Sequence, residues 1–213
     1  MPESSNQPSS PGRESEQAHV FLSDIAEIRR RARQHIQNGA ITACYGADRE
    51  TVLRLLNEAL ATELVCVLRY KRHYYMVGGA LGEAIKGELL QHADEEQGHA
   101  DQLAQRIVEL GGAPDFNPDG MSDRSHSEYA EGDTLSDMLA EDLIAERIAI
   151  ESYREIIQYL GHTNSTTRRL FESILAMEEE HAEDIRSMRE DLLRRDHGSN
   201  GPDHGEARST ELQ

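Results

Sequence analysis

The chain contains 213 residues, of which 37% are hydrophobic and 29% are charged, and its formal net charge at pH 7 is −18. This length suits one domain with a full hydrophobic core plus additional chain. The acidic charge excludes a general binder of nucleic acid or of anionic membranes, because both need an excess of Lys and Arg, and it makes cations the natural partners.

Targeting and redox signals are sparse. The sequence has no apolar run near the roughly 20 residues that span a bilayer, and its first ten residues lack the basic start and apolar stretch of a signal peptide. We therefore expect a cytoplasmic protein. The two cysteines, Cys44 and Cys66, have neither CxxC spacing nor the number for a disulfide framework, so we interpret both as small apolar residues.

Both ends of the chain are polar. Residues 1–17 and 196–213 show no apolar periodicity, and we expect them to be disordered tails. The intervening segment 18–48 is expected to hold a short amphipathic helix over 18–37, where apolar residues at helical spacing lie beside a run of arginines, followed by a linker.

Four longer helical patterns follow, over 49–77, 80–110, 134–160 and 165–195. Glycines at 78 and 79 separate the first pair and residues 161–164 separate the second, so each pair predicts an antiparallel hairpin. The connection over 111–133 is long enough to cross the bundle, and Thr134 with Asp137 resembles a capping arrangement that restarts a helix. The predicted fold is all-α, a four-helix bundle over 49–195 made of two hairpins joined by a long crossover, plus the short N-terminal helix.

The second hairpin repeats a pattern of the first. Each hairpin carries one glutamate on its first helix and a Glu-x-x-His motif on its second: Glu63 with Glu96 and His99, then Glu146 with Glu178 and His181. A tyrosine also follows the first glutamate by seven residues in each hairpin, at Tyr70 and Tyr153. A Glu-x-x-His pair occurs at 16–19 as well, in the expected tail, so the motif alone is weak and the repeat carries the interpretation.

These six residues interrupt apolar stripes that should face the core, because positions three and four apart share one side of a helix. Four buried carboxylates must be protonated, paired with buried cations or bound to metal. Neither Lys nor Arg lies in the stripes near them. Two divalent cations would balance the four charges, and two imidazoles would supply nitrogen ligands. A solvated acidic face with coincidental histidines is the alternative, and it fits single residues better than the repeated set.

Residues 49–195 resemble the ferritin-like di-iron superfamily, and bacterioferritin most of all. The resemblance implies a ferroxidase that stores and detoxifies iron, oxidising Fe(II) with dioxygen or hydrogen peroxide at two irons within one subunit. It implies that Glu63 and Glu146 are terminal ligands, that Glu96 and Glu178 bridge the irons, and that His99 and His181 each supply one nitrogen. It also implies a catalytic Tyr70 beside the centre, hydrogen-bonded to Asp142, for which a core tyrosine is the plainer alternative.

The sequence also departs from bacterioferritin. Gln97 stands where that family has the methionine that holds haem, which speaks against haem binding. The extra N-terminal helix and the absence of a fifth helix favour a homo-oligomeric cage of twelve subunits over one of 24.

Two other functions share parts of the pattern. Rubrerythrin-like peroxidases and manganese catalases use the same ligands, and oxygen and imidazole donors suit manganese as well as iron. The third possible function is that of a miniferritin-type DNA-protecting protein. Nucleic acid is not an expected partner, because such binding usually needs a basic tail and residues 1–20 contain one Arg and no Lys. Near the centre, His73, Gln91, His92 and Glu95 fit either a guide for iron or ordinary packing.

Overall fold

The computed structural model describes residues 24–199. The chain divides into two compact units, and the boundary along the sequence falls between Ala43 and Cys44. The described part of the first unit contains α1 (Ile25–Ala32) and a single 3-10 turn, η1 (Ile36–Asn38). The helix expected over 18–37 is therefore shorter, and residues 18–23 lie outside the described range. His35 adopts a left-handed φ of 52°, which a continuing α-helix of L-residues does not tolerate.

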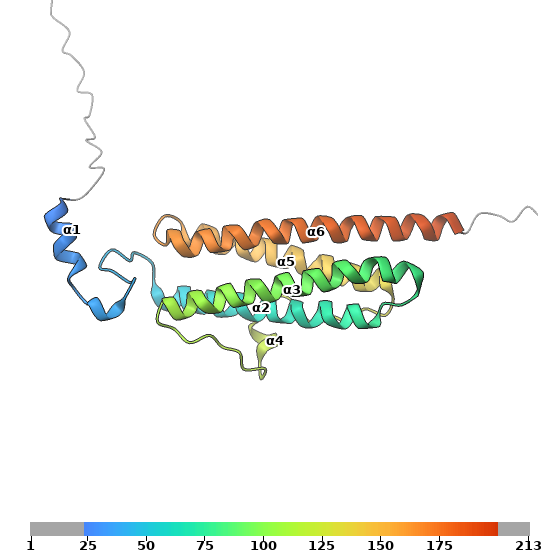
Figure 1. The fold of residues 1–213 in the computed structure, drawn as a ribbon, viewed down its shortest axis with the longest axis horizontal. Coiled ribbons are helices and arrows are strands. Elements are labelled where there is room, and N and C mark those ends of the chain that lie inside the picture. The colour runs from blue at the N-terminus through green and yellow to red at the C-terminus, as the bar shows by residue number, and fades with distance from the viewer. Residues whose placement is uncertain (1–23, 200–213) are drawn as a thin grey trace, which may run out of the picture. The chain divides into compact units, whose positions relative to one another are not determined.

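The second unit is an all-helical bundle, which confirms the predicted fold class. Its helices are α2 (Arg49–Met76), α3 (Gly79–Glu109), α4 (Met121–Arg124), α5 (Leu135–Leu160) and α6 (Ser165–Ser199). Helix α2 packs against α3 and α5 against α6, and the two hairpins meet through α2 with α5 and α3 with α6 (Figure 1).

Local chemistry explains where the long helices begin and end. Asp48 caps α2 by accepting a hydrogen bond from the backbone N–H of Thr51. Thr134 and Asp137 form the reciprocal capping box expected before α5. Gly161, with a φ of 49°, ends α5 in a conformation that favours glycine. Helix α6 continues to Ser199, past its predicted end at 195.

The long crossover runs from the end of α3 along the outside of the bundle to the opposite end, where α5 begins (Figure 1). It contains the short helix α4, which the sequence pattern did not predict. Two hydrogen bonds attach it to α2: the N–H of Asp115 donates to Asn57 Oδ1 at 2.8 Å, and the N–H of His126 donates to Thr62 Oγ1 at 2.9 Å. The crossover therefore forms a cover over one side of α2.

The core lies between the four long helices and includes Leu56, Leu60, Leu89, Leu103, Leu139, Phe171 and Ile185, each fully buried. Cys66 is buried, as expected of a small apolar residue, whereas Cys44 is exposed. Within residues 24–199, none of the helices combines the length and the apolar character that crossing a membrane requires.

Candidate metal centre

The six residues of the repeated pattern come together inside the bundle, and each is at most 5% exposed. They form two overlapping groups whose ligand atoms lie within 4.8 Å of one another: Glu63, Glu96, Glu178 and His99, then Glu96, Glu146, Glu178 and His181. Each group has three carboxylates and one imidazole. Because Glu96 and Glu178 belong to both groups, the arrangement can hold two cations with two carboxylates between them.

The histidine distances show how the shared carboxylates are oriented. Glu178 places Oε1 at 3.0 Å from His99 Nδ1 and Oε2 at 3.6 Å from His181 Nδ1. Glu96 places Oε2 at 3.3 Å from His99 Nδ1 and Oε1 at 3.3 Å from His181 Nδ1. Each shared carboxylate thus directs one oxygen to either half of the centre, as a bridging ligand does.

Two buried tyrosines contact the other pair of glutamates. The hydroxyl of Tyr70 donates to Glu146, and the hydroxyl of Tyr153 donates to Glu63. Each bond joins the two hairpins. Tyr70 and Glu63 are on α2, whereas Glu146 and Tyr153 are on α5. The expected partner of Tyr70 was Asp142, and the structure corrects this. Tyr153 was predicted only as a member of the repeat, and its contact with Glu63 mirrors that of Tyr70 with Glu146.

Asp142 belongs to a buried network next to the centre. It accepts from Arg69 Nε at 3.1 Å and lies 2.8 Å from His73 Nδ1. The side chain of Arg69 is 1% exposed and also donates to Ser127 Oγ on the crossover at 3.2 Å. A cationic side chain is therefore buried near the acids, which the sequence pattern did not indicate, and its carboxylate partner is Asp142.

Burial and crowding alter the protonation of the metal-free centre. Burial raises the pKa of Glu63 to about 8, and repulsion from Glu96 adds to the rise. Burial also raises the pKa of Glu146 well above its ordinary value, aided by the charges of Glu96 and Glu178. For His181, burial opposes the charged form, but the neighbouring carboxylates of Glu178 and Glu96 stabilise it and raise the pKa to about 11. Protons thus hold part of the charge balance that bound cations would supply.

The donor set fits divalent metal ions. Both oxygens of Glu178, Oε1 of Glu96, Oε2 of Glu146 and Nδ1 of His181 are buried and have no hydrogen-bond partner among the described residues. Buried polar atoms are rarely left without partners, and two cations, one in each half of the centre, would satisfy all of these. Carboxylate and imidazole donors suit iron and manganese.

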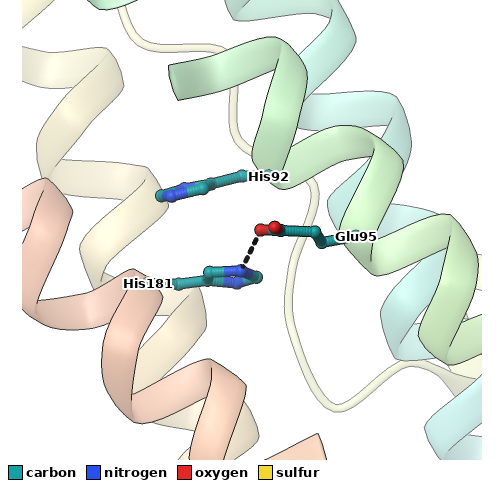
Figure 2. A group of neighbouring side chains, drawn as sticks. All are labelled: His92, Glu95 and His181. Carbon is teal, nitrogen blue, oxygen red and sulfur yellow. Dashed lines mark hydrogen bonds and ion pairs between the residues drawn. The ribbon is translucent and has the colours of Figure 1, made fainter. Parts of the chain in front are cut away.

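Residues on α3 surround the His181 half of the centre. Glu95 Oε2 lies 2.8 Å from His181 Nε2 (Figure 2). Gln91 Nε2 donates to Glu95 Oε1 at 3.0 Å. The contact to Glu95 fixes the histidine tautomer that keeps Nδ1 free for a metal. The His92 ring stacks on His181 with centroids 4.2 Å apart, and burial lowers the pKa of His92 to about 4. Gln97 occupies the position at which bacterioferritins are expected to have the haem-binding methionine. Its Nε2 donates to Asp101 Oδ1 at 3.1 Å.

The ferritin-like domain family matches residues 53–194, the part of the chain that forms the bundle and contains all six centre residues. The chain belongs to the ferritin-like domain family. Its bundle is 30% identical over 135 residues to a bacterioferritin of Desulfovibrio desulfuricans, covering 61% of this chain and 69% of that protein. It is also 34% identical over 140 residues to a DNA protection during starvation protein of Pyrococcus furiosus, covering 64% and 75% of the two chains.

A solved structure with the same fold is that of a dodecameric thioferritin, the bacterioferritin-related protein of Bacteroides fragilis. It superposes on this ferritin-like chain with a TM-score of 0.69 and 30% sequence identity, over 73% of this chain and 94% of the other. The family, the fold and the similarity to bacterioferritins expected from the repeated motif are therefore confirmed.

Proposed function

We propose that this ferritin-like chain is a ferroxidase that oxidises Fe(II) to Fe(III) and takes part in iron storage and detoxification. The observation that supports this proposal most strongly is a pair of overlapping ligand groups. Each has three carboxylates and one imidazole, and the two groups share Glu96 and Glu178. In this assignment Glu96 and Glu178 bridge two ferrous ions, the substrate. Glu63 with His99 completes one position and Glu146 with His181 completes the other.

The reaction balances with dioxygen or hydrogen peroxide as the oxidant. Two ferrous ions lose one electron each; dioxygen takes both electrons with two protons and leaves as hydrogen peroxide, or peroxide takes them and leaves as two waters. Hard carboxylate oxygens favour the ferric product. Tyr70 and Tyr153 hold Glu146 and Glu63 by hydrogen bonds, which limits the positions these carboxylates can adopt as the metal charge changes.

Substitution of a bridging residue tests this function. We expect Glu96→Ala and Glu178→Ala each to lower the initial rate of Fe(II) oxidation by about 100-fold or more, because each substitution removes a ligand from both metal positions at once. The rate is followed by stopped-flow absorbance of the ferric product under air and under peroxide. The exposed Glu180, two residues from Glu178, provides the control: Glu180→Ala should keep the wild-type rate. Wild-type rates in either bridging variant would contradict the assignment.

The native metal separates this function from the manganese-dependent alternative. Metal analysis of the protein from its own host, with an assay of peroxide disproportionation in the absence of Fe(II), distinguishes the two. Iron content with no peroxide disproportionation supports the ferroxidase, and manganese with rapid disproportionation supports a catalase.

We further propose that the subunits assemble into a closed homo-oligomeric cage of twelve. The dodecameric assembly of the Bacteroides fragilis relative supports this number. In a cage, the net charge of −18 per chain would attract ferrous ions to the protein. The same charge disfavours DNA as a partner, although one relative is named for DNA protection.

A further inference from the structure

A buried polar network lies beside the half of the centre that contains Glu146, which we call the Glu146 half. Asp142 on α5 accepts from Arg69 Nε at 3.1 Å, and its two oxygens lie 2.9 and 2.8 Å from His73 Nδ1. These three side chains are each at most 1% exposed. Asp142 precedes Glu146 by about one helical turn, so both carboxylates are on the same side of α5. Since Tyr70 on α2 donates to Glu146, polar contacts join α2 and α5 at two successive turns.

The crossover contacts the same network. Arg69 donates to Ser127 Oγ at 3.2 Å and to the carbonyl oxygen of Glu128 at 3.1 Å. His73 Nε2 lies 2.9 Å from the carbonyl oxygen of Glu131. Both side chains on α2 thus contact α5 and the crossover together, and the guanidinium of Arg69 presents its donors in a fixed plane. Because hydrogen bonds are directional, the network restricts the rotation and the offset of α2 against α5 in this half of the centre.

The internal repeat shows that the other half, which contains Glu63, lacks this network. When Glu63 is aligned with Glu146, the residues that correspond to Arg69, His73 and Asp142 are Ser152, Ile156 and Ala59. Because Ile156 and Ala59 have no polar side-chain atoms, an equivalent network cannot form at these positions. The hydroxyl of Ser152 donates instead to the carbonyl oxygen of Ile148 on its own helix, at 2.7 Å. Ser152 and Ile156 line a cleft of about 340 Å³ together with residues of α2 and the crossover.

We propose that Arg69 and His73 are positioning residues for the Glu146 half, and that its metal position binds a cation more tightly than the position in the Glu63 half. A ligand that is already held in place loses less conformational freedom when it binds, which favours affinity. The charge of Arg69 opposes the cation little, because Asp142 pairs with it. The proposal rests on the proposed function, in which the cation is Fe(II), and it implies that the two ferrous ions bind in a fixed order.

Binding of Co²⁺ to the metal-free, full-length protein tests the proposal without the oxidation reaction, because oxygen and imidazole donors suit this ion as well. Calorimetric titration of the wild type should give two equivalents of unequal affinity. Anomalous scattering from crystals that hold less than two equivalents should place the tighter one in the Glu146 half.

Two substitutions outside the ligand set remove contacts of the network. Arg69→Lys keeps the charge but not the planar fork that reaches Asp142 and Ser127 together, and His73→Phe removes both ring nitrogens. We expect each to weaken the tighter equivalent by about tenfold and to leave the weaker one unchanged. Ser152→Ala, at the counterpart of Arg69, is the control that should change neither. If these variants do not fold, Ser127→Ala, which removes a single acceptor of Arg69, should weaken the same equivalent by a smaller factor.

The outcomes separate the positioning role from a purely structural one and from the proposed function. Equal affinities in the wild type, unchanged binding in the variants, or a loss shared by both equivalents would overturn the positioning role. Two bound cobalt ions in a wild-type protein that does not oxidise Fe(II) would overturn the proposed function alone. Absence of cobalt from the centre would overturn both.

Discussion

At the scale of single residues, the centre depends on proton positions as much as on ligands. Six acid and imidazole side chains share a space from which water is largely excluded. Burial raises the pKa of Glu63 to about 8, and His181 keeps its proton up to a pKa of about 11. A cation that binds to these groups must displace their protons.

Metal binding should therefore release protons and strengthen with pH. At pH 7 we expect Zn²⁺ binding to release about one proton or more per chain, and the affinity to rise as the pH approaches 8, because Glu63 is protonated below its raised pKa. Calorimetry in two buffers of different ionisation enthalpy measures the number. A pH-independent affinity with no proton release would contradict it. In the metal-free protein, the same raised carboxyl pKa stabilises the fold at lower pH, and this contribution is lost as the pH rises through about 8.

The tyrosine hydroxyls offer a second test at this scale. Tyr153→Phe removes the hydrogen bond to Glu63 and leaves the ring in place, so we expect about a tenfold loss of Zn²⁺ affinity, typical of groups that orient a metal ligand. Tyr70→Phe should act alike through Glu146. Tyr159→Phe, whose ring is about half exposed, is the control that should keep wild-type affinity. An unchanged affinity in Tyr153→Phe would show that the hydroxyl does not orient the ligand.

At the scale of elements, the crossover is attached to the bundle by charged groups on α2. Arg69 is buried, pairs with Asp142 on α5 and donates to Ser127 on the crossover. Arg72 binds Glu131 of the crossover at 2.6 Å, and both of these side chains are partly or largely exposed. Both arginines connect α2 to the crossover, but Arg69 is buried and Arg72 is partly exposed. A comparison of the two therefore isolates the effect of burial.

Removing Arg69 should destabilise the bundle far more than removing Arg72. We expect Arg69→Met to lower the free energy of unfolding by about 3–5 kcal/mol, because the buried Asp142 would lose the guanidinium of Arg69 and retain the contact to His73. Arg72→Met should cost at most about 1 kcal/mol, as exposed ion pairs do. Urea unfolding of the metal-free protein measures both. Equal effects would show that burial of the pair is not what stabilises this part of the fold.

At the scale of the whole molecule, assembly and charge act together. A chain with a net charge of −18 repels its own copies unless favourable contacts or bound cations compensate. We expect light scattering of the full-length protein to give the mass of twelve chains at physiological salt. A dimer or a 24-subunit particle would contradict the proposed cage without affecting the centre, because all six proposed ligands come from one subunit.

Much of this protein could be predicted from its sequence, because the informative signals are local. Apolar spacing predicted the four long helices, glycines marked their ends, and the repeated Glu and Glu-x-x-His pattern named the six residues that converge in the bundle. Each signal depends on positions a few residues apart along one helix, where geometry is regular.

Which side chains contact one another across neighbouring helices could be seen only in the tertiary structure. Tyr70 bonds to Glu146 and not to Asp142, and Arg69, one residue beside the predicted apolar stripe, is buried because the crossover covers that side of α2. The grouping of His92 and Glu95 with His181 likewise joins α3 to α6. Such partners depend on the rotation and offset of packed helices and on the path of a long connection, and no spacing within one segment of sequence contains that information.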